Sequence, residues 1–137
     1  MKKAIFILAV LLHASLMPLC AQCLTLEVYG INQSQGYLYV AIYDSKDNFM
    51  KAPIAAFRAE VKADTLRIPC QGLPPGEYAL SLYQDVNGNG RLDTGTFGIP
   101  QEPYGFSNNA KGVMGPPSYK QCLFTLREDT VMEIELQ

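Results

Sequence analysis

Hydrophobic and polar residues alternate along several short runs of this chain, and such alternation predicts half-buried β-strands. In residues 24–31 leucine and valine recur at every second position, and in residues 77–84 tyrosine and leucine do the same. Residues 37–44 are rich in aromatic and β-branched side chains, as is typical of strands. The core positions expected in the first run are Leu24, Leu26 and Val28.

Two further runs have weaker patterns. Residues 65–70 contain Pro69, and proline is best tolerated in an edge strand because it lacks an amide proton. Residues 54–61 combine alanines, which favour a helical turn, with an alternation toward the end of the segment. We interpret that end as a strand.

Turn residues separate two pairs of neighbouring runs, so both pairs are predicted to form hairpins. The first joins 24–31 to 37–44, and the second joins 122–126 to 130–136. The core contributors expected in the last run are Val131, Ile134 and Leu136. Seven short strands at this spacing indicate an all-β fold, an antiparallel Greek-key β-sandwich of the immunoglobulin-like or prealbumin-like kind.

The first 21 residues have the pattern of a signal peptide. Two lysines precede an apolar run from Ala4 to Leu16, and Ala21 offers a small residue for cleavage. The apolar run is shorter than the roughly 20 residues of a membrane helix, and no later segment suffices. We therefore expect export to the periplasm or the medium, with attachment to the outer membrane as an alternative. Residues 22–137 are expected to form a single domain.

Charge and histidine content narrow the chemistry. Of the 11 basic residues, Lys2 and Lys3 leave with the signal, so 9 face 13 acidic residues, which disfavours nucleic acid as a partner. The one histidine, His13, also lies in the signal. Without an imidazole the exported chain lacks the base of serine–histidine and cysteine–histidine nucleophile systems and the ligand of most zinc sites. We therefore expect no enzymatic activity.

Three cysteines remain after cleavage, Cys23, Cys70 and Cys122. Pairing is the rule in an oxidising compartment, so each is a disulfide candidate, and one must stay unpaired within the chain. A bond between Cys23 and Cys122 is slightly preferred. Three buried free thiols are the alternative, because cysteine packs well as a small apolar residue.

An acidic loop follows the predicted strand 77–84 directly. It places side-chain oxygens at alternate residues and a glycine sixth, which is the pattern of a calcium-binding loop. The expected ligands are the side chains of Asp85, Asn87, Asn89 and Asp93 and the backbone carbonyl of Arg91.

The acidic loop departs from the helix–loop–helix calcium motif in two ways. Thr96 stands where a bidentate glutamate is expected, and a strand precedes the loop in place of a helix. Glu102 is therefore proposed as a further ligand, brought back by the chain that follows. The alternative is a metal-free turn, because Asn89-Gly90 is a strong hairpin dipeptide and Asp85 is able to cap its own loop.

Residues 94–119 form a long segment with many glycines and prolines and no periodicity, so something must organise it. Tyr104, Phe106 and Tyr119 lie in this segment and are the expected ligand-binding residues. The alternative is that these rings only pin the segment to the sandwich. Asn108 and Asn109 are expected to hydrogen-bond loop backbone.

Several motifs in the second half of the chain resemble a known family. They are GEYA at 76–79, DVNGNGRLDT at 85–94, GIP at 98–100, EPYGFSNN at 102–109 and GPP at 115–117. Together they are similar to the bacterial domain-of-unknown-function family 2141, over nearly the whole exported chain. The resemblance implies an exported, compact β-sandwich with no established activity and no catalytic residues to carry over.

Taken together, these features indicate a non-enzymatic binding or structural module with a calcium-stabilised loop, acting on a protein or glycan partner. The first alternative is a carbohydrate or small-ligand binding module that uses the loop aromatics. The second is a metal-dependent hydrolase that activates a bound water.

Overall fold

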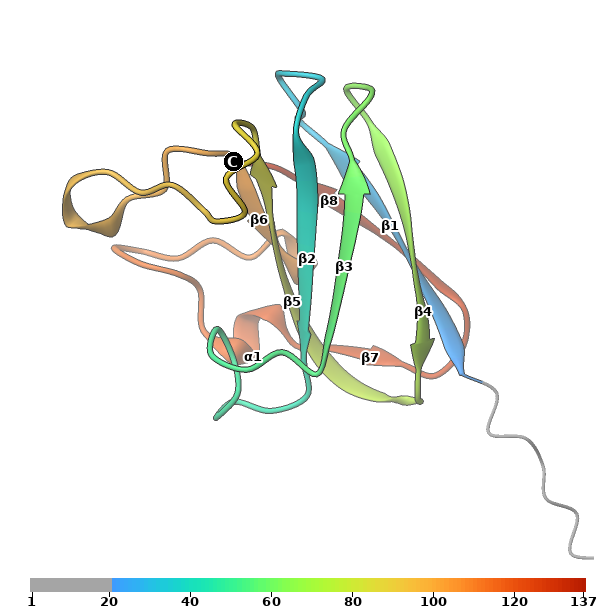
Figure 1. Ribbon diagram of the computed structural model, residues 1–137. Coiled ribbons are helices and arrows are strands. Elements are labelled where there is room, and N and C mark those ends of the chain that lie inside the picture. Colours follow the sequence, from blue (N-terminus) through green and yellow to red (C-terminus); the bar gives the residue numbers. More distant parts are fainter. Residues whose placement is uncertain (1–20) are drawn as a thin grey trace, which may run out of the picture.

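The computed structural model describes residues 21–137 (Figure 1). Apart from Ala21, the predicted signal peptide lies outside this range. In this described part of the chain, eight strands account for most of the regular structure, and the helices are one short α-helix and two 3-10 turns. Within residues 21–137 no helix is long and apolar enough to cross a membrane.

The strands form two sheets that face each other across one core (Figure 1). The smaller sheet has the order β4 (Leu66–Leu73), β1 (Gln22–Tyr29), β8 (Thr130–Glu135). The larger sheet has the order β3 (Ala55–Glu60), β2 (Tyr37–Tyr43), β5 (Gly76–Asp85), β6 (Tyr104–Phe106), and β7 (Phe124–Leu126) pairs with the start of β5. All pairings are antiparallel except that of β1 with β8. The prediction of an all-β, mostly antiparallel fold is confirmed.

Both predicted hairpins are wrong. β1 pairs with β4 and β8, whereas β2 pairs with β3 and β5, so the chain crosses from one sheet to the other between β1 and β2. In the same way β7 pairs with β5 and β8 pairs with β1. Turn residues indicate that the chain changes direction, but they do not say which strand becomes the neighbour. Two consecutive strands that bury one face each can do so from opposite sides of the core.

The core lies between the two sheets. The predicted inward positions of β1 are fully buried, and so are Leu38, Ile42 and Leu80 of the larger sheet. The predictions for Ile134 in β8 and for Leu136 just after it are confirmed, but that for Val131 is wrong. Val131 is 54% exposed, because alternation in β8 turns Thr130, Met132 and Ile134 inward instead.

Pairing of β6 with β5 organises the long segment 94–119. The 3-10 turn η1 (Thr96–Gly98) precedes β6, and η2 (Ser107–Asn109) follows it directly. The segment ends at α1 (Tyr119–Cys122), whose first turn is closed by a capping box between Ser118 and Gln121. α1 packs its Cys122 with Ala79 and Phe106 in a second, smaller apolar cluster.

Candidate functional site

The acidic loop closes around the carboxylate of Asp85, the last residue of β5. Asp85 is fully buried. Its Oδ1 accepts the backbone N–H of Gly88 at 2.9 Å and of Asn89 at 3.1 Å, and its Oδ2 accepts that of Gly90 at 2.7 Å. The carboxylate therefore serves as the hub of the turn, an arrangement that local side-chain to backbone hydrogen bonds favour.

Asp93 closes the other side of the loop. The side-chain amides of Asn87 and Asn89 both donate to its carboxylate, and the Arg91 guanidinium lies 3.5 Å from its Oδ1. The hydrogen bond from Asn89, followed by that from Asn87, lowers the pKa of Asp93 from its ordinary value, and the charge of Arg91 adds to the effect. Donors of the chain itself thus stabilise this negative charge.

Glu102 lies against the same loop, although it belongs to the segment that follows. Its Oε1 accepts the Val86 N–H and its Oε2 accepts the Asp93 N–H, each at 2.9 Å. The Gln101 N–H donates to the Asp93 carbonyl at 2.8 Å, which brings the returning chain alongside. Glu102 is only 8% exposed, so its carboxylate joins the two ends of the acidic loop from within the structure.

A polar cleft lies beside the acidic loop. Its volume is about 390 Å³, and its lining comprises Asn32 and Gln33 between β1 and β2, Gln84, Val86 and Asn87 at the end of β5, and residues 93 and 101–103. Of the six candidate metal ligands, Asn87, Asp93 and Glu102 line this cleft, whereas Asp85, Asn89 and Arg91 do not. The structure thus divides the candidates into two groups of three.

The side-chain oxygens of Asn87 and Asn89 accept hydrogen bonds from within the loop. Asn87 Oδ1 accepts the Asn89 N–H at 3.1 Å, and Asn89 Oδ1 accepts the Arg91 N–H at 3.0 Å. For these two oxygens to face a cation beside Asp93, both amides must turn over and lose these bonds. Within residues 21–137 no group of three or more histidine, cysteine, aspartate or glutamate side chains is gathered as a metal site requires.

Gln84 is a residue that the pattern of calcium ligands does not indicate. It is fully buried at the end of the polar cleft, and its Nε2 donates to the Gln33 carbonyl at 2.7 Å and to the Gln35 carbonyl at 2.9 Å. Its Oε1 has no hydrogen-bond partner. The sequence does carry a signal for this residue, because the alternation of Tyr78, Leu80 and Leu82 continues inward to position 84.

A second, apolar cleft lies beside β5 and β6 of the larger sheet. Residues 94–101 and 111–118 project from the sandwich on this side (Figure 1). It is formed by β5, β6, residues 94–100 and residues 112–117, and its volume is about 630 Å³. The apolar groups in its lining include Leu82, Leu92, Phe97, Ile99, Met114 and Pro117. None of the residues that line it carries a charged side chain. Leu92 of the acidic loop is half-buried and lines this cleft.

The three candidate ligand-binding aromatics do not all line the same cleft. Tyr104 and Phe106 line the apolar cleft, whereas Tyr119 does not. Tyr119 packs against Phe49, with 5.7 Å between ring centroids, beside the buried Phe106. Among the aromatic residues that line the cleft, Phe97 has the most exposed side chain, at 96%.

The residues after β6 hold the segment to the sandwich. Ser107 is buried, and its hydroxyl accepts the Leu80 N–H and donates to the Cys122 carbonyl. Asn108 donates to the Leu123 carbonyl, and Asn109 accepts the Glu135 N–H at 2.8 Å. The prediction that both residues bond loop backbone is confirmed for Asn108, whereas Asn109 bonds the backbone of strand β8 instead.

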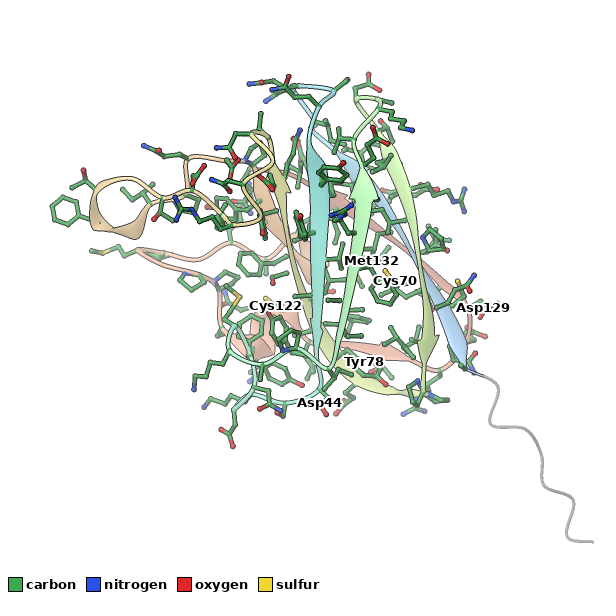
Figure 2. The ribbon with its side chains drawn as sticks, in the orientation of Figure 1. Asp44, Cys70, Tyr78, Cys122, Asp129 and Met132 are labelled. Carbon is green, nitrogen blue, oxygen red and sulfur yellow. The ribbon has the colours of Figure 1, made fainter. Side chains whose placement is uncertain are left out.

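The cysteines of the described chain are free thiols, and the expected bond between Cys23 and Cys122 is not found. Cys70 lies in the core between the sheets, whereas Cys122 lies in the smaller cluster under α1 (Figure 2). Cys23, on β1, donates its N–H to Asp129. Burial raises the pKa of Cys70 to about 12 and that of Cys122 to about 11, so both thiols stay protonated.

One comparison with known proteins gives a match. A family model described as an uncharacterised protein conserved in bacteria, with the domain of unknown function 2141, matches residues 26–135. The match spans both sheets, the acidic loop and both clefts, and it confirms the resemblance seen in the sequence. No curated protein and no solved structure matches the chain.

Proposed function

We propose that this chain, which belongs to the bacterial family with the domain of unknown function 2141, is an exported, non-enzymatic binding module. Its ligand is a small, uncharged molecule with a large apolar part, held in the apolar cleft. The observation that carries this proposal is the apolar cleft itself, walled by two loops and free of charged side chains in its lining.

The size and chemistry of the apolar cleft support such a ligand. Its volume of about 630 Å³ falls in the range of small-molecule sites, roughly 300 to 1,000 Å³. Apolar side chains at its rim stand in solvent, since Phe97 is 96%, Ile99 is 64% and Met114 is 103% exposed. Exposed apolar groups gathered around a hollow are typical of binding sites.

The apolar cleft has a floor of paired strands and walls of loops. Its floor is the paired β5 and β6, in register at Tyr83 and Tyr104, with Phe106 buried beside them. Its walls are loops that carry Met50 and Met114, whose unbranched side chains adapt to ligands of different shape. A fixed floor with adaptable walls suits a binding module.

We further propose that calcium stabilises the acidic loop. The carboxylates of Asp85, Asp93 and Glu102 each make polar contacts in the acidic loop, and among the ion pairs of residues 21–137 only that of Arg91 with Asp93 involves one of them. Calcium prefers oxygen ligands and would offset this negative charge. Because the loop leads directly into residues 94–100, its order bears on one wall of the apolar cleft.

Two finer assignments belong to the same proposal. The first is export to the periplasm or the medium, supported by the signal-like residues 1–21. The second is a Greek-key sandwich of the immunoglobulin-like or prealbumin-like kind, supported by the crossings between sheets from β1 to β2 and from β7 to β8.

The test of ligand binding uses the neutral fluorophore N-phenyl-1-naphthylamine. We expect its fluorescence to rise on binding and its affinity to fall at least tenfold in Ile99→Asp, because a carboxylate in the lining repels an apolar ligand. Val131→Asp is the matched control, since Val131 is exposed on β8 and away from both clefts. Equal affinity in both variants, or no binding by the wild type, would contradict the proposed function.

A further inference from the structure

We infer that the polar cleft is the cation site of this protein, in which Gln84 Oε1 joins the carboxylates of Glu102 and Asp93 around one hard divalent cation, calcium. This inference rests on the proposed binding of calcium, and it assigns the cation to a different position. The cation lies between the acidic loop and the connection from β1 to β2, and not inside the loop. Gln84 becomes a ligand, and Asp85 becomes a residue that only shapes the site.

The first support is the orientation of Gln84. Both protons of its Nε2 are used, because they donate to the carbonyls of Gln33 and Gln35. The amide therefore has one allowed orientation, and Oε1 must be the group without a partner. A fully buried acceptor left unpaired costs on the order of 1 to 3 kcal/mol, so such an atom calls for a partner from outside the chain.

The second support is the charge around the polar cleft. Asp93 and Glu102 line it, and no lysine or arginine does. Glu102 is 8% exposed and forms no ion pair among those of residues 21–137. Each of its two oxygens accepts one backbone N–H and keeps a lone pair for a further contact. A buried carboxylate with open lone pairs and no counter-charge favours a cation.

The third support is the state of Asp85. Its two oxygens are taken up by three backbone N–H groups, and it lines neither cleft. Asn89 likewise turns its Nδ2 toward Asp93 and lies outside the polar cleft. The interior of the loop is therefore occupied by the loop's own hydrogen bonds, whereas the polar cleft beside it is open.

The ligand count fits a weak calcium site. One oxygen from Gln84, one or two from Glu102 and one from Asp93 leave positions that water fills, since calcium takes six to eight oxygens. Two carboxylates place the affinity near the extracellular range, about 10⁻⁴ to 10⁻³ M. The competing occupant of the same space is a bridging water, which also partners buried acceptors.

The deciding experiment titrates calcium chloride into chelator-treated protein by calorimetry, with three variants. Gln84→Met removes the unpartnered oxygen, and Glu102→Gln removes the charge and keeps the acceptor for Val86. Asn89→Ser removes the amide oxygen that a cation inside the loop would use, together with the hydrogen bond to Asp93, which Asn87 and Arg91 still contact. We expect the wild type to bind one calcium. The affinity should fall at least tenfold in Gln84→Met and Glu102→Gln, and it should change less than threefold in Asn89→Ser.

A second measurement guards against variants that fold poorly. In the wild type, calcium should shift the NMR signals of the Gln84 side-chain amide and of the Val86 and Asp93 backbone N–H groups, which all adjoin the polar cleft. Shifts confined to Gly88, Asn89 and Gly90 would place the cation inside the loop and overturn the inference.

The failures of the two proposals are distinguishable. If calcium binds, and Asn89→Ser abolishes binding while Gln84→Met does not, the cation is in the loop and only the inference fails. If the wild type binds no calcium up to about 10 mM, both the calcium proposal and the inference fail, and Gln84 Oε1 holds a water. Binding of the fluorophore is a separate result in either case.

Discussion

Glu102 accepts the backbone N–H of Val86 across a separation of 16 residues, with 2.9 Å between Oε1 and the amide nitrogen. Its other oxygen accepts the N–H of Asp93. One side chain thus holds the beginning and the end of the acidic loop, and the chain that follows the loop supplies it.

Removal of this carboxylate should destabilise the protein. Glu102→Ala leaves the N–H groups of Val86 and Asp93 without partners at a partly buried site. We expect the free energy of unfolding in urea to fall by about 2 kcal/mol or more. Gln101→Ala is the control, because Gln101 is the exposed neighbour, and a change within about 0.5 kcal/mol is expected there. Equal effects of the two variants would show that Glu102 does not secure the loop.

Asp93 should make the fold sensitive to acid. Its pKa is lowered in the folded state, chiefly by Asn89 and then Asn87. The stability from its ionised form is therefore fully present above the unfolded pKa, about 3.9, and is lost as the pH falls through the lower folded value. Between pH 6 and pH 2 the melting temperature of Asp93→Asn should fall less steeply than that of the wild type.

The control for the acid experiment is Asp64→Asn, which removes an exposed carboxyl between β3 and β4. We expect its melting temperature to follow the wild-type curve more closely. If the two variants follow one curve, the amides of Asn87 and Asn89 do not hold the Asp93 carboxylate in solution.

Gly36→Ala should separate the β1–β2 connection from the acidic loop. A Cβ at this position would lie 2.0 Å from the Asp85 carbonyl oxygen, and Gly36 has φ of +76°. Gly72→Ala is the matched control, because Gly72 has φ of +85° but no atom within 4 Å of its Cβ position. In urea unfolding we expect the control to lose about 1 to 2 kcal/mol of stability, because alanine is strained in the left-handed conformation. Gly36→Ala should lose clearly more. Similar losses would exclude close packing at Gly36.

The buried thiols should resist alkylation in the native state. Burial raises the pKa of Cys70 to about 12 and that of Cys122 to about 11, and only the thiolate reacts rapidly. With iodoacetamide at pH 8 we expect peptide mass spectrometry to find Cys23 modified first, and all three modified in urea. Because both folded pKa values are raised, the contribution of these two thiols to the free energy of unfolding is fully present below the unfolded pKa of about 8.5. That contribution declines as the pH rises above it. Rapid native modification of Cys70 would contradict its place in the core.

Periodicity in the sequence predicts burial better than it predicts pairing. Leu24 and Leu26 are fully buried as their alternation predicts, because the period of two is a property of a single strand. The partner of that strand, β8, begins at Thr130, and no local signal indicates a parallel pairing over such a separation. Periodicity also mispredicts burial within one strand, because β8 turns the face opposite to Val131 toward the core.

In the candidate site too, local features could be predicted from the sequence, whereas most contacts between distant segments could not. The polar spacing predicts a calcium loop, with a turn capped by Asp85 as the alternative, and the structure has the hydrogen bonds of such a turn. An aspartate that accepts N–H groups three to five residues later is a local arrangement. The polar cleft depends on Gln33, Gln84 and Glu102 meeting from three segments. Two features of the sequence pointed there, the proposed return of Glu102 to the acidic loop and the inward position of Gln84 in the alternation of β5. The apolar cleft likewise depends on two loops that meet in space.

The parallel pairing of β1 with β8 has a consequence for the order in which the domain assembles. Leu24 lies opposite Thr130, and the N–H of Leu136 donates to the carbonyl of Tyr29. A chain that emerges N-terminus first therefore leaves β1 with β4 as its one sheet neighbour until the final residues arrive. Pairings over such long separations form slowly. Closure of the smaller sheet is therefore delayed until β8 arrives, and one edge of β1 stays unpaired until then.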